Sequence, residues 1–326
     1  MKTLSILITD MGFIVPSMQM AEQLTRPDLA RLTDVMVFVL DPPEGFIEAL
    51  RQEFGSPSVR LVGLSTKDFA ASSDYARYFK GHVPLAALAR LEICDMIPDC
   101  YDRVMYLDGD MQLVGDIAPL LQLEVPEGRI AAAVENFVMF EGPRGRRPDW
   151  LESYLAALQL GGAGSYFNSG LMLFRRTTWA KVAPRALDFF LTHADICAHH
   201  DQSALNAVCA GDWLPLSPAY NYLTFYLKMG GLDGMKPKIL HFASAPKPWQ
   251  SPESPWPPRH AETYRRFMDR HPALQGRLTV YDPAQVPPVP MRAVKATKVK
   301  ARALLKTPGL ARNFRRYVRR TQFLLD

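Results

Sequence analysis

From Val104 to Val114 the chain reads VMYLDGDMQLV, which is an apolar run, two aspartates separated by one glycine, and a second apolar run. Apolar runs of this length predict strands, so Asp108 and Asp110 are expected at the end of a buried strand. Carboxylates in such a place oppose folding unless they are paired or bind a cation, and a divalent metal is the simplest partner. Because a D-x-D pattern alone is a weak signal, the alternative is an ordinary solvated turn.

Short apolar runs alternate with helix-like stretches on both sides of this segment. The expected helices are Met18–Leu24, Phe46–Phe54 and Leu85–Met96. The expected strands span residues 4–9, 34–40, 59–63, 104–107, 129–134, 169–174 and 238–241. This alternation predicts an α/β fold in which a mostly parallel sheet carries helices on its faces. Since ligands bind beyond the carboxyl ends of such strands, Asp10 and Asp108 are predicted to lie on one rim.

The composition is that of an ordinary globular protein. The chain has 326 residues, of which 48% are hydrophobic and 22% are charged. No segment reaches ~18 consecutive apolar residues, so no membrane-spanning helix is predicted. Asp10 interrupts the N-terminal apolar stretch, which therefore fits a first strand better than a signal peptide. The four cysteines lack C-x-x-C spacing, which favours thiols in a reducing compartment over a disulfide framework or a zinc site.

Positive charge is concentrated near the C-terminus. Residues 292–326 hold eleven Lys and Arg residues and one acidic residue. The rest of the chain holds 27 Lys and Arg residues and 32 acidic residues. Phe314, Tyr317, Val318 and Leu325 are spaced to share one side of a helix, with arginines around them. This pattern predicts a basic amphipathic helix that docks on an anionic membrane surface. The alternatives are an RNA-binding arm and a helix packed on the body, and no specific nucleic-acid partner is expected.

The charge distribution divides the chain into a globular domain, residues 1–290, and a basic amphipathic tail, residues 291–326. Within the domain, residues 246–290 begin with a segment that is rich in proline and contains two tryptophans. We expect this part to be an irregular and helical extension of the domain.

Two polar patterns lie further along the chain than the aspartate pair. Asn168-Ser169-Gly170 stands at the start of a predicted strand and offers an amide and a hydroxyl to a sugar, although a plain turn would use the same residues. Asp201-Gln202 opens a helix-like stretch, where the alternative for Asp201 is a structural N-cap.

Two more patterns carry groups that can be cationic. His241 follows an apolar run and is either a third metal ligand or a hydrogen-bonded structural residue. Lys247 lies six residues later and can offer a point charge to a phosphate. His82 and Arg90 flank the helix that precedes the aspartate pair, and the alternative for both is simple surface exposure.

In this order and spacing, the motifs resemble glycosyltransferase family 8, whose members are retaining, metal-dependent enzymes with the GT-A fold. The most similar branch is that of the bacterial lipopolysaccharide galactosyl- and glucosyltransferases. The resemblance runs from about Leu4 to Trp249 and rests on Leu88-Ala89-Arg90-Leu91, Tyr106-Leu107-Asp108-Gly109-Asp110, Tyr166-Phe167-Asn168-Ser169-Gly170, Asp201-Gln202, and His241 with Lys247-Pro248-Trp249. It implies a Rossmann-like, mixed and mostly parallel sheet flanked by helices, and a UDP-sugar as the donor.

The resemblance also implies how the donor is bound. Asp108, Asp110 and His241 would hold Mn²⁺, or alternatively Mg²⁺. Lys247 would neutralise the leaving phosphate. Asp10 would lie near the uracil or ribose, and His82 near the phosphates or the donor sugar.

Other positions would form the sugar pocket and the loop over the diphosphate. The residues implied as catalytic are Gln202, Asp201, Arg90 and Asn168. Ser244 stands where the family has a glycine, which lets the backbone approach the diphosphate closely. Gly109, between the two aspartates, is interpreted as leaving the approach of the donor unobstructed.

The implied reaction is transfer of galactose or glucose from a UDP-sugar to an acceptor hydroxyl, with retention of configuration. The metal and Lys247 would stabilise negative charge on the leaving diphosphate. Gln202 would face the anomeric carbon, and because an amide is a poor nucleophile, front-face attack by the acceptor is favoured over double displacement. The expected acceptor is a bacterial surface glycan or glycolipid such as lipopolysaccharide.

The expected location is cytoplasmic, with the enzyme bound peripherally to the inner face of the cell membrane. Two alternatives for the function remain. One is a metal-dependent nucleotidyltransferase, and the other is a catalytically weakened, membrane-associated binding protein on the same fold.

Overall fold

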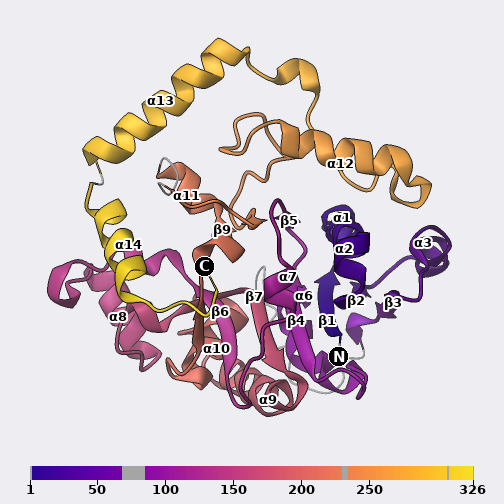
Figure 1. Ribbon diagram of the computed structural model, residues 1–326, viewed down its shortest axis with the longest axis horizontal. Helices are drawn as coiled ribbons and strands as arrows, with labels where there is room; N and C mark the ends of the chain where they lie inside the picture. The colour runs from indigo at the N-terminus through magenta and orange to yellow at the C-terminus, as the bar shows by residue number, and fades with distance from the viewer. Residues whose placement is uncertain (1, 68–84, 230–233, 307, 326) are drawn as a thin grey trace.

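The computed structural model describes residues 2–67, 85–229, 234–306 and 308–325, and a seven-stranded sheet lies at its centre (Figure 1). The strand order is β3-β2-β1-β4-β7-β6-β8, and only β7 among these runs antiparallel to its neighbours. The strands are β1 (Thr3–Thr9), β2 (Thr33–Leu40), β3 (Val59–Leu64), β4 (Arg103–Asp108), β6 (Ile130–Val134), β7 (Phe167–Arg175) and β8 (Leu214–Leu216). The predicted mixed, mostly parallel α/β sheet is therefore confirmed.

A second, three-stranded sheet has the order β5-β10-β9. It consists of β5 (Met111–Leu113), β10 (Ile239–His241) and β9 (Tyr222–Leu223). Strand β4 of the central sheet leads into β5 of the second sheet through a turn of two residues, because β4 ends at Asp108 and β5 begins at Met111. Asp108 therefore ends β4, and Asp110 lies in a turn that joins the two sheets.

The helices cover the central sheet, whose strands β1 and β6 are buried along their whole length, as strands covered on both faces must be. Helix α1 packs on β1, β2 and β5, while α6, α9 and α10 pack on one another. In the described residues of the body, the helices are α1 (Ile14–Leu24), α2 (Pro27–Ala30), α3 (Phe46–Phe54), α6 (Leu85–Glu92), α7 (Ala118–Leu121), α8 (Asp149–Ala157), α9 (Arg176–Thr192), α10 (His200–Cys209), α11 (Thr224–Lys228) and α12 (Arg259–Arg270). The helix predicted over Leu85–Met96 changes to a 3₁₀ turn at Ile93.

The basic tail folds into two helices, α13 (Val289–Lys306) and α14 (Pro308–Arg320). The predicted boundary at residue 290 thus falls in the first turn of α13. None of the helices in the described ranges combines the length and the hydropathy needed to cross a bilayer.

Helix α14 packs on the body through the side that carries its aromatic residues. Phe314 is only 2% exposed, and its ring centroid lies 5.2 Å from that of Tyr226. Asn313 Nδ2 donates a hydrogen bond of 2.9 Å to the carbonyl of Met139. Leu325 lies beyond the helix, where its carbonyl accepts a hydrogen bond from the Ser217 N–H. The alternative of a helix packed on the body is therefore the correct one for the apolar side of α14.

Candidate active site

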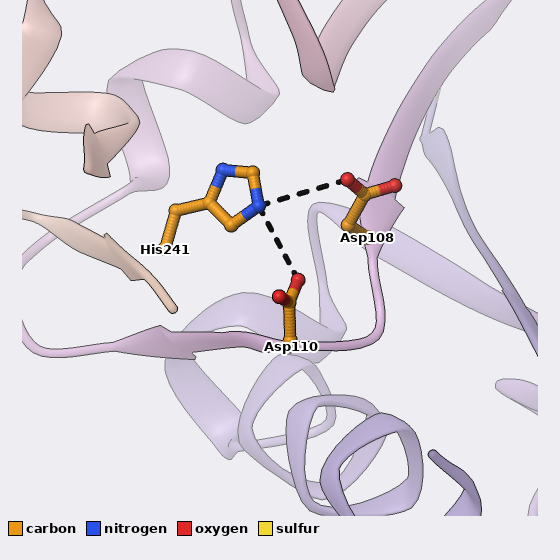
Figure 2. Close-up of side chains that lie close together, drawn as sticks. All are labelled: Asp108, Asp110 and His241. Carbon is orange, nitrogen blue, oxygen red and sulfur yellow. Dashed lines mark ion pairs between the residues drawn. The ribbon is translucent and has the colours of Figure 1, made fainter. Parts of the chain in front are cut away.

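The two aspartates and His241 converge because β5 pairs with β10. The pairing is antiparallel and sets His241 opposite Met111, the residue after Asp110. In addition, the Phe242 N–H donates to the Asp110 carbonyl at 3.0 Å. The Nε2 atom of His241 consequently lies 3.3 Å from Asp110 Oδ1 and 3.7 Å from Asp108 Oδ2 (Figure 2).

These three side chains form a donor set that fits a metal ion. Each offers one ligand atom, and the atoms all lie within 4.8 Å of one another. One imidazole nitrogen beside two carboxylate oxygens suits Mn²⁺ better than Ca²⁺ or Mg²⁺. Burial lowers the pKa of His241, but the carboxylates of Asp110 and Asp108 outweigh it and raise that pKa above its usual value. The site thus attracts positive charge at the position that Nε2 faces.

The hydrogen bonds behind His241 fix which ring nitrogen faces the carboxylates. The backbone N–H of Gly170 donates to Asn168 Oδ1 at 3.0 Å, so this oxygen is an acceptor. Asn221 must then present its Nδ2 to Asn168, at 2.8 Å, and its Oδ1 faces His241 Nδ1, also at 2.8 Å. Therefore Nδ1 carries a proton and Nε2 points toward Asp108 and Asp110, as in metal sites with a supporting hydrogen bond.

Gly170 makes room for this arrangement. A Cβ atom at this position would lie 2.4 Å from His241 Cε1 and 2.7 Å from Asp108 Oδ2. The glycine of the Asn168-Ser169-Gly170 motif is thus explained by close packing of β7 against the triad.

Gly109 is explained differently from our interpretation of the sequence. A Cβ atom there would lie 2.2 Å from the Oγ of Ser17 in α1. This glycine therefore lets the turn pack against α1, which is a steric reason that the interpretation from the sequence did not include.

Arg90 is a buried cation at the end of α6, only 4% exposed, so the alternative of an exposed surface residue is wrong. Its guanidinium forms an ion pair with Asp201, and its NH1 lies 3.6 Å from Asp108 Oδ1. NH1 also donates to the carbonyl of Ser169 at 2.9 Å, and the guanidinium carbon lies 4.7 Å from the ring centroid of Tyr106. Arg90 therefore ties α6 to α10, β4 and β7.

Asp201 is the buried partner of this cation rather than a helix cap. The N-cap residue of α10 is His199, and Asp201 is 2% exposed in the first turn. Burial raises the pKa of Asp201 to about 6, with a contribution from the nearby Asp108 and in spite of Arg90, which lowers it. The N-cap alternative is therefore wrong, and the Arg90–Asp201 pair is part of the site.

Glu135 is a site residue that the sequence analysis missed. It follows β6, is 8% exposed, and its Oε2 accepts hydrogen bonds from Asn168 Nδ2 at 2.8 Å and from Gln202 Nε2 at 3.1 Å. Gln202 Oε1 accepts in turn from the Ser169 N–H at 3.0 Å. An acidic residue directly after a buried apolar run is the same signal that identified Asp10 and Asp108, and it was available at Glu135.

These polar groups surround one cavity of about 490 Å³. Its lining includes Glu135 together with the predicted residues Arg90, Asp108, Asp110, Asn168, Asp201, Gln202, His241 and Ser244. The cavity therefore joins a metal-type donor set to a wall of amides, hydroxyls and carboxylates, which is the chemistry needed to hold a sugar and an anionic leaving group.

Two predicted residues that the structure describes, Asp10 and Lys247, are not in that lining. Asp10 is exposed at the end of β1, where its Oδ1 accepts hydrogen bonds from the N–H groups of Gly12 and Phe13. Lys247 lies next to the triad, with its Nζ 2.6 Å from Asp110 Oδ2. Burial opposes ionisation of Asp110, but Lys247 and His241 hold the pKa of that carboxyl well below its usual range. His82 lies outside the described residues.

A family model described as "Glycosyl transferase family 8" matches residues 58–253, which is more than half of the chain. The chain belongs to glycosyltransferase family 8. The matched range contains every predicted site residue except Asp10.

The similar proteins agree with this assignment. General stress protein A of Bacillus subtilis (strain 168) is 31% identical over 250 residues, which cover 70% of this chain and 80% of that protein. Lipopolysaccharide glucosyltransferase WaaO of Escherichia coli (strain K12) is 30% identical over 171 residues, covering 49% of this chain and 48% of WaaO. The crystal structure of the galactosyltransferase LgtC in complex with donor and acceptor sugar analogues matches with a TM-score of 0.61 and 19% identity, covering 89% of this chain and 99% of LgtC.

The fold and the enzyme class predicted from the sequence are thereby confirmed. The likeness to LgtC shows that the family 8 chain has the GT-A fold. Family membership places the chain among the glycosyltransferases and excludes the nucleotidyltransferase alternative.

Proposed function

We propose that this family 8 enzyme transfers galactose or glucose from a UDP-sugar to a hydroxyl of a bacterial surface glycan or glycolipid such as lipopolysaccharide, with retention. The observation that carries the proposal is the convergence of Asp108, Asp110 and His241 beside a polar cavity. The likeness to WaaO, a lipopolysaccharide glucosyltransferase, and to LgtC, a galactosyltransferase, supports a hexose as the transferred group. We place the enzyme in the cytoplasm, peripherally bound to the inner face of the cell membrane.

Asp108, Asp110 and His241 would hold the metal, which we propose to be Mn²⁺ or alternatively Mg²⁺. When bound, such an ion supplies Lewis-acid stabilisation of the negative charge on the departing diphosphate. Lys247 provides a second positive charge next to Asp110, on the loop that also carries Ser244. Asp10, at the end of β1, would contact the uracil or ribose.

The remaining polar side chains would bind and orient the sugars. Arg90 holds Asp201 beside the cavity, where the carboxylate can accept hydrogen bonds from the donor sugar. Asn168, Gln202 and Glu135 present a connected set of amide and carboxylate groups to the same space. In front-face attack, the acceptor oxygen bonds to the anomeric carbon as the bond to the diphosphate oxygen breaks, and the departing phosphate takes the acceptor's proton.

The test of this function is metal-dependent release of UDP, measured with UDP-galactose and UDP-glucose in the presence of Mn²⁺ and after chelation. We expect UDP release from one of these donors with Mn²⁺ and its loss with the chelator. Binding of a UDP-sugar without any turnover would contradict the proposal and favour the alternative of a weakened binding protein.

Substitution of Asn221 tests the support of the metal site. Asn221→Ala removes the acceptor of the His241 Nδ1 proton and frees the ring to rotate. The expected result is a loss of about 10- to 100-fold in Mn²⁺ affinity, measured from the electron paramagnetic resonance signal of free Mn²⁺. Asn313→Ala, which removes an amide from α14 instead, should leave the affinity unchanged. Unaltered Mn²⁺ binding by Asn221→Ala would show that His241 does not depend on this bond.

A further inference from the structure

Exposed apolar side chains gather on helix α13. Eight large hydrophobic side chains are exposed among the residues whose burial the structure describes, and four of them belong to this helix. Their exposed fractions are 66% for Val289, 63% for Met291, 54% for Val294 and 83% for Leu305. Single exposed hydrophobic residues are common on soluble proteins, but a cluster on one element indicates an interaction surface.

Most of this cluster forms one stripe along the helix. Met291, Val294, Lys298, Ala301 and Leu305 follow one another at intervals of three and four residues and are all exposed. Residues at this spacing share one side of an α-helix. We call Met291, Val294 and Leu305 the apolar stripe. A lysine in its middle gives the stripe an amphiphilic character.

Another side of α13 faces the body. Arg292, Lys295 and Val299 line a groove of about 450 Å³ together with Trp256 and its neighbouring prolines, and Met291 belongs to the same lining although it is 63% exposed. Lys295 also forms an ion pair with Glu253. Figure 1 shows α13 running along the outer edge of the molecule, away from the central sheet. The helix is therefore anchored on its inner side and presents Val294 and Leu305 outward, while Met291 is exposed next to the groove.

Helix α14 has the opposite arrangement. Its Phe314 is buried on the body, whereas Arg312, Arg315, Arg319 and Arg320 are exposed. Helix α14 thus contributes positive charge to the surface, while α13 contributes the apolar side chains.

We propose that α13 inserts the apolar stripe into the interface of an anionic lipid bilayer, with the arginines of α14 at the level of the lipid phosphates. An anionic bilayer is the partner that matches the charge of this surface, because residues 292–326 carry eleven basic residues and one acidic residue. The same charge opposes pairing with a second copy, since two such helices would repel each other. This inference rests on the proposed peripheral membrane location, and it moves the inserting element from α14 to α13.

The experiment is flotation of the full chain with phosphatidylcholine vesicles that contain or lack phosphatidylglycerol. Wild-type protein should float with the anionic vesicles and remain unbound with the neutral ones. The triple variant Met291→Ser, Val294→Ser, Leu305→Ser should lose at least about tenfold in partitioning, because three apolar side chains no longer enter the lipid. The double variant Met96→Ser, Val114→Ser changes exposed apolar residues of the body and should float like the wild type.

A charge variant and a turnover assay complete the test. Arg319→Gln with Arg320→Gln should weaken flotation on anionic vesicles while the apolar stripe stays intact. UDP-sugar turnover in solution is measured on the same preparations, so failure of the proposed function appears as absent turnover in the wild type.

Three results would overturn the inference. The first is a wild type that does not float with anionic vesicles. The second is a triple variant that floats as well as the wild type. The third is light scattering that finds a wild-type dimer and a monomeric triple variant, because the stripe would then cover a second copy.

Discussion

Asp110→Asn is expected to lower metal-dependent UDP-sugar turnover by about 10³-fold or more, which corresponds to about 4 kcal/mol of lost transition-state stabilisation. The substitution keeps the size of the side chain and removes its charge. Asp110 Oδ1 lies 3.3 Å from His241 Nε2 and Oδ2 lies 2.6 Å from Lys247 Nζ, so a single carboxylate faces both the imidazole and the ammonium group. Without this carboxylate, the donor set falls from two carboxylates and an imidazole to one of each.

The measurement is the initial rate of UDP release over a titration of Mn²⁺, together with direct Mn²⁺ binding to the variant. Asp116→Asn is the matched control, because Asp116 is exposed a few residues further on and accepts a hydrogen bond from the Ala118 N–H. The control should retain turnover within about twofold, as expected for a surface substitution. Near-normal turnover and Mn²⁺ affinity in Asp110→Asn would refute the metal assignment.

Gly170→Ala is expected to disable the site by adding one methyl group. The new Cβ would lie 2.4 Å from His241 Cε1 and 2.7 Å from Asp108 Oδ2, closer than non-bonded atoms approach. His241 is 3% exposed and held by Asn221, so it cannot move aside without breaking that bond. We expect a loss of about 100-fold in Mn²⁺ affinity and turnover, and about 1–3 kcal/mol in the free energy of unfolding.

Turnover, Mn²⁺ binding and chemical denaturation of the variant check this result. Gly161→Ala serves as the control, since a Cβ at Gly161 meets no atom within 4 Å. The control should match the wild type in all three measurements. If Gly170→Ala binds Mn²⁺ normally, the three ligand side chains are not positioned by close packing against β7.

Local sequence patterns were sufficient for seven of the ten described strands, the fold class and the family, whereas the short strands β5, β8 and β9 were not among the expected strands. A strand is recognised from its own residues, because a short apolar run flanked by polar residues can be buried only in a few ways. This applies to β1, β4 and β6, which lie within one residue of their predicted bounds. The acidic residues that follow such runs, Asp10 and Asp108, could be assigned to one rim because parallel strands end on the same side of a sheet.

Long-range partners were not available from the sequence. Nothing in residues 239–241 specifies that β10 pairs with β5, yet this pairing places His241 beside Asp110. The hydrogen bonds of Asn221 and the steric demand on Gly170 exist only after β7, β9 and β10 come together. The same applies to Arg90. Its position in α6 is compatible with exposure, and its burial depends on Asp201 from α10.

The tail shows most clearly which properties follow from the sequence and which depend on the tertiary structure. The sequence by itself determined that residues 292–326 are basic and that their helices have apolar sides, because charge and helical spacing are properties of the residues alone. Only the tertiary structure decided what covers each apolar side: the body covers Phe314 of α14, while Met291 and Val294 of α13 remain exposed. Periodicity fixes which residues share a side of a helix, but burial is a relation between that side and atoms that the chain brings from elsewhere.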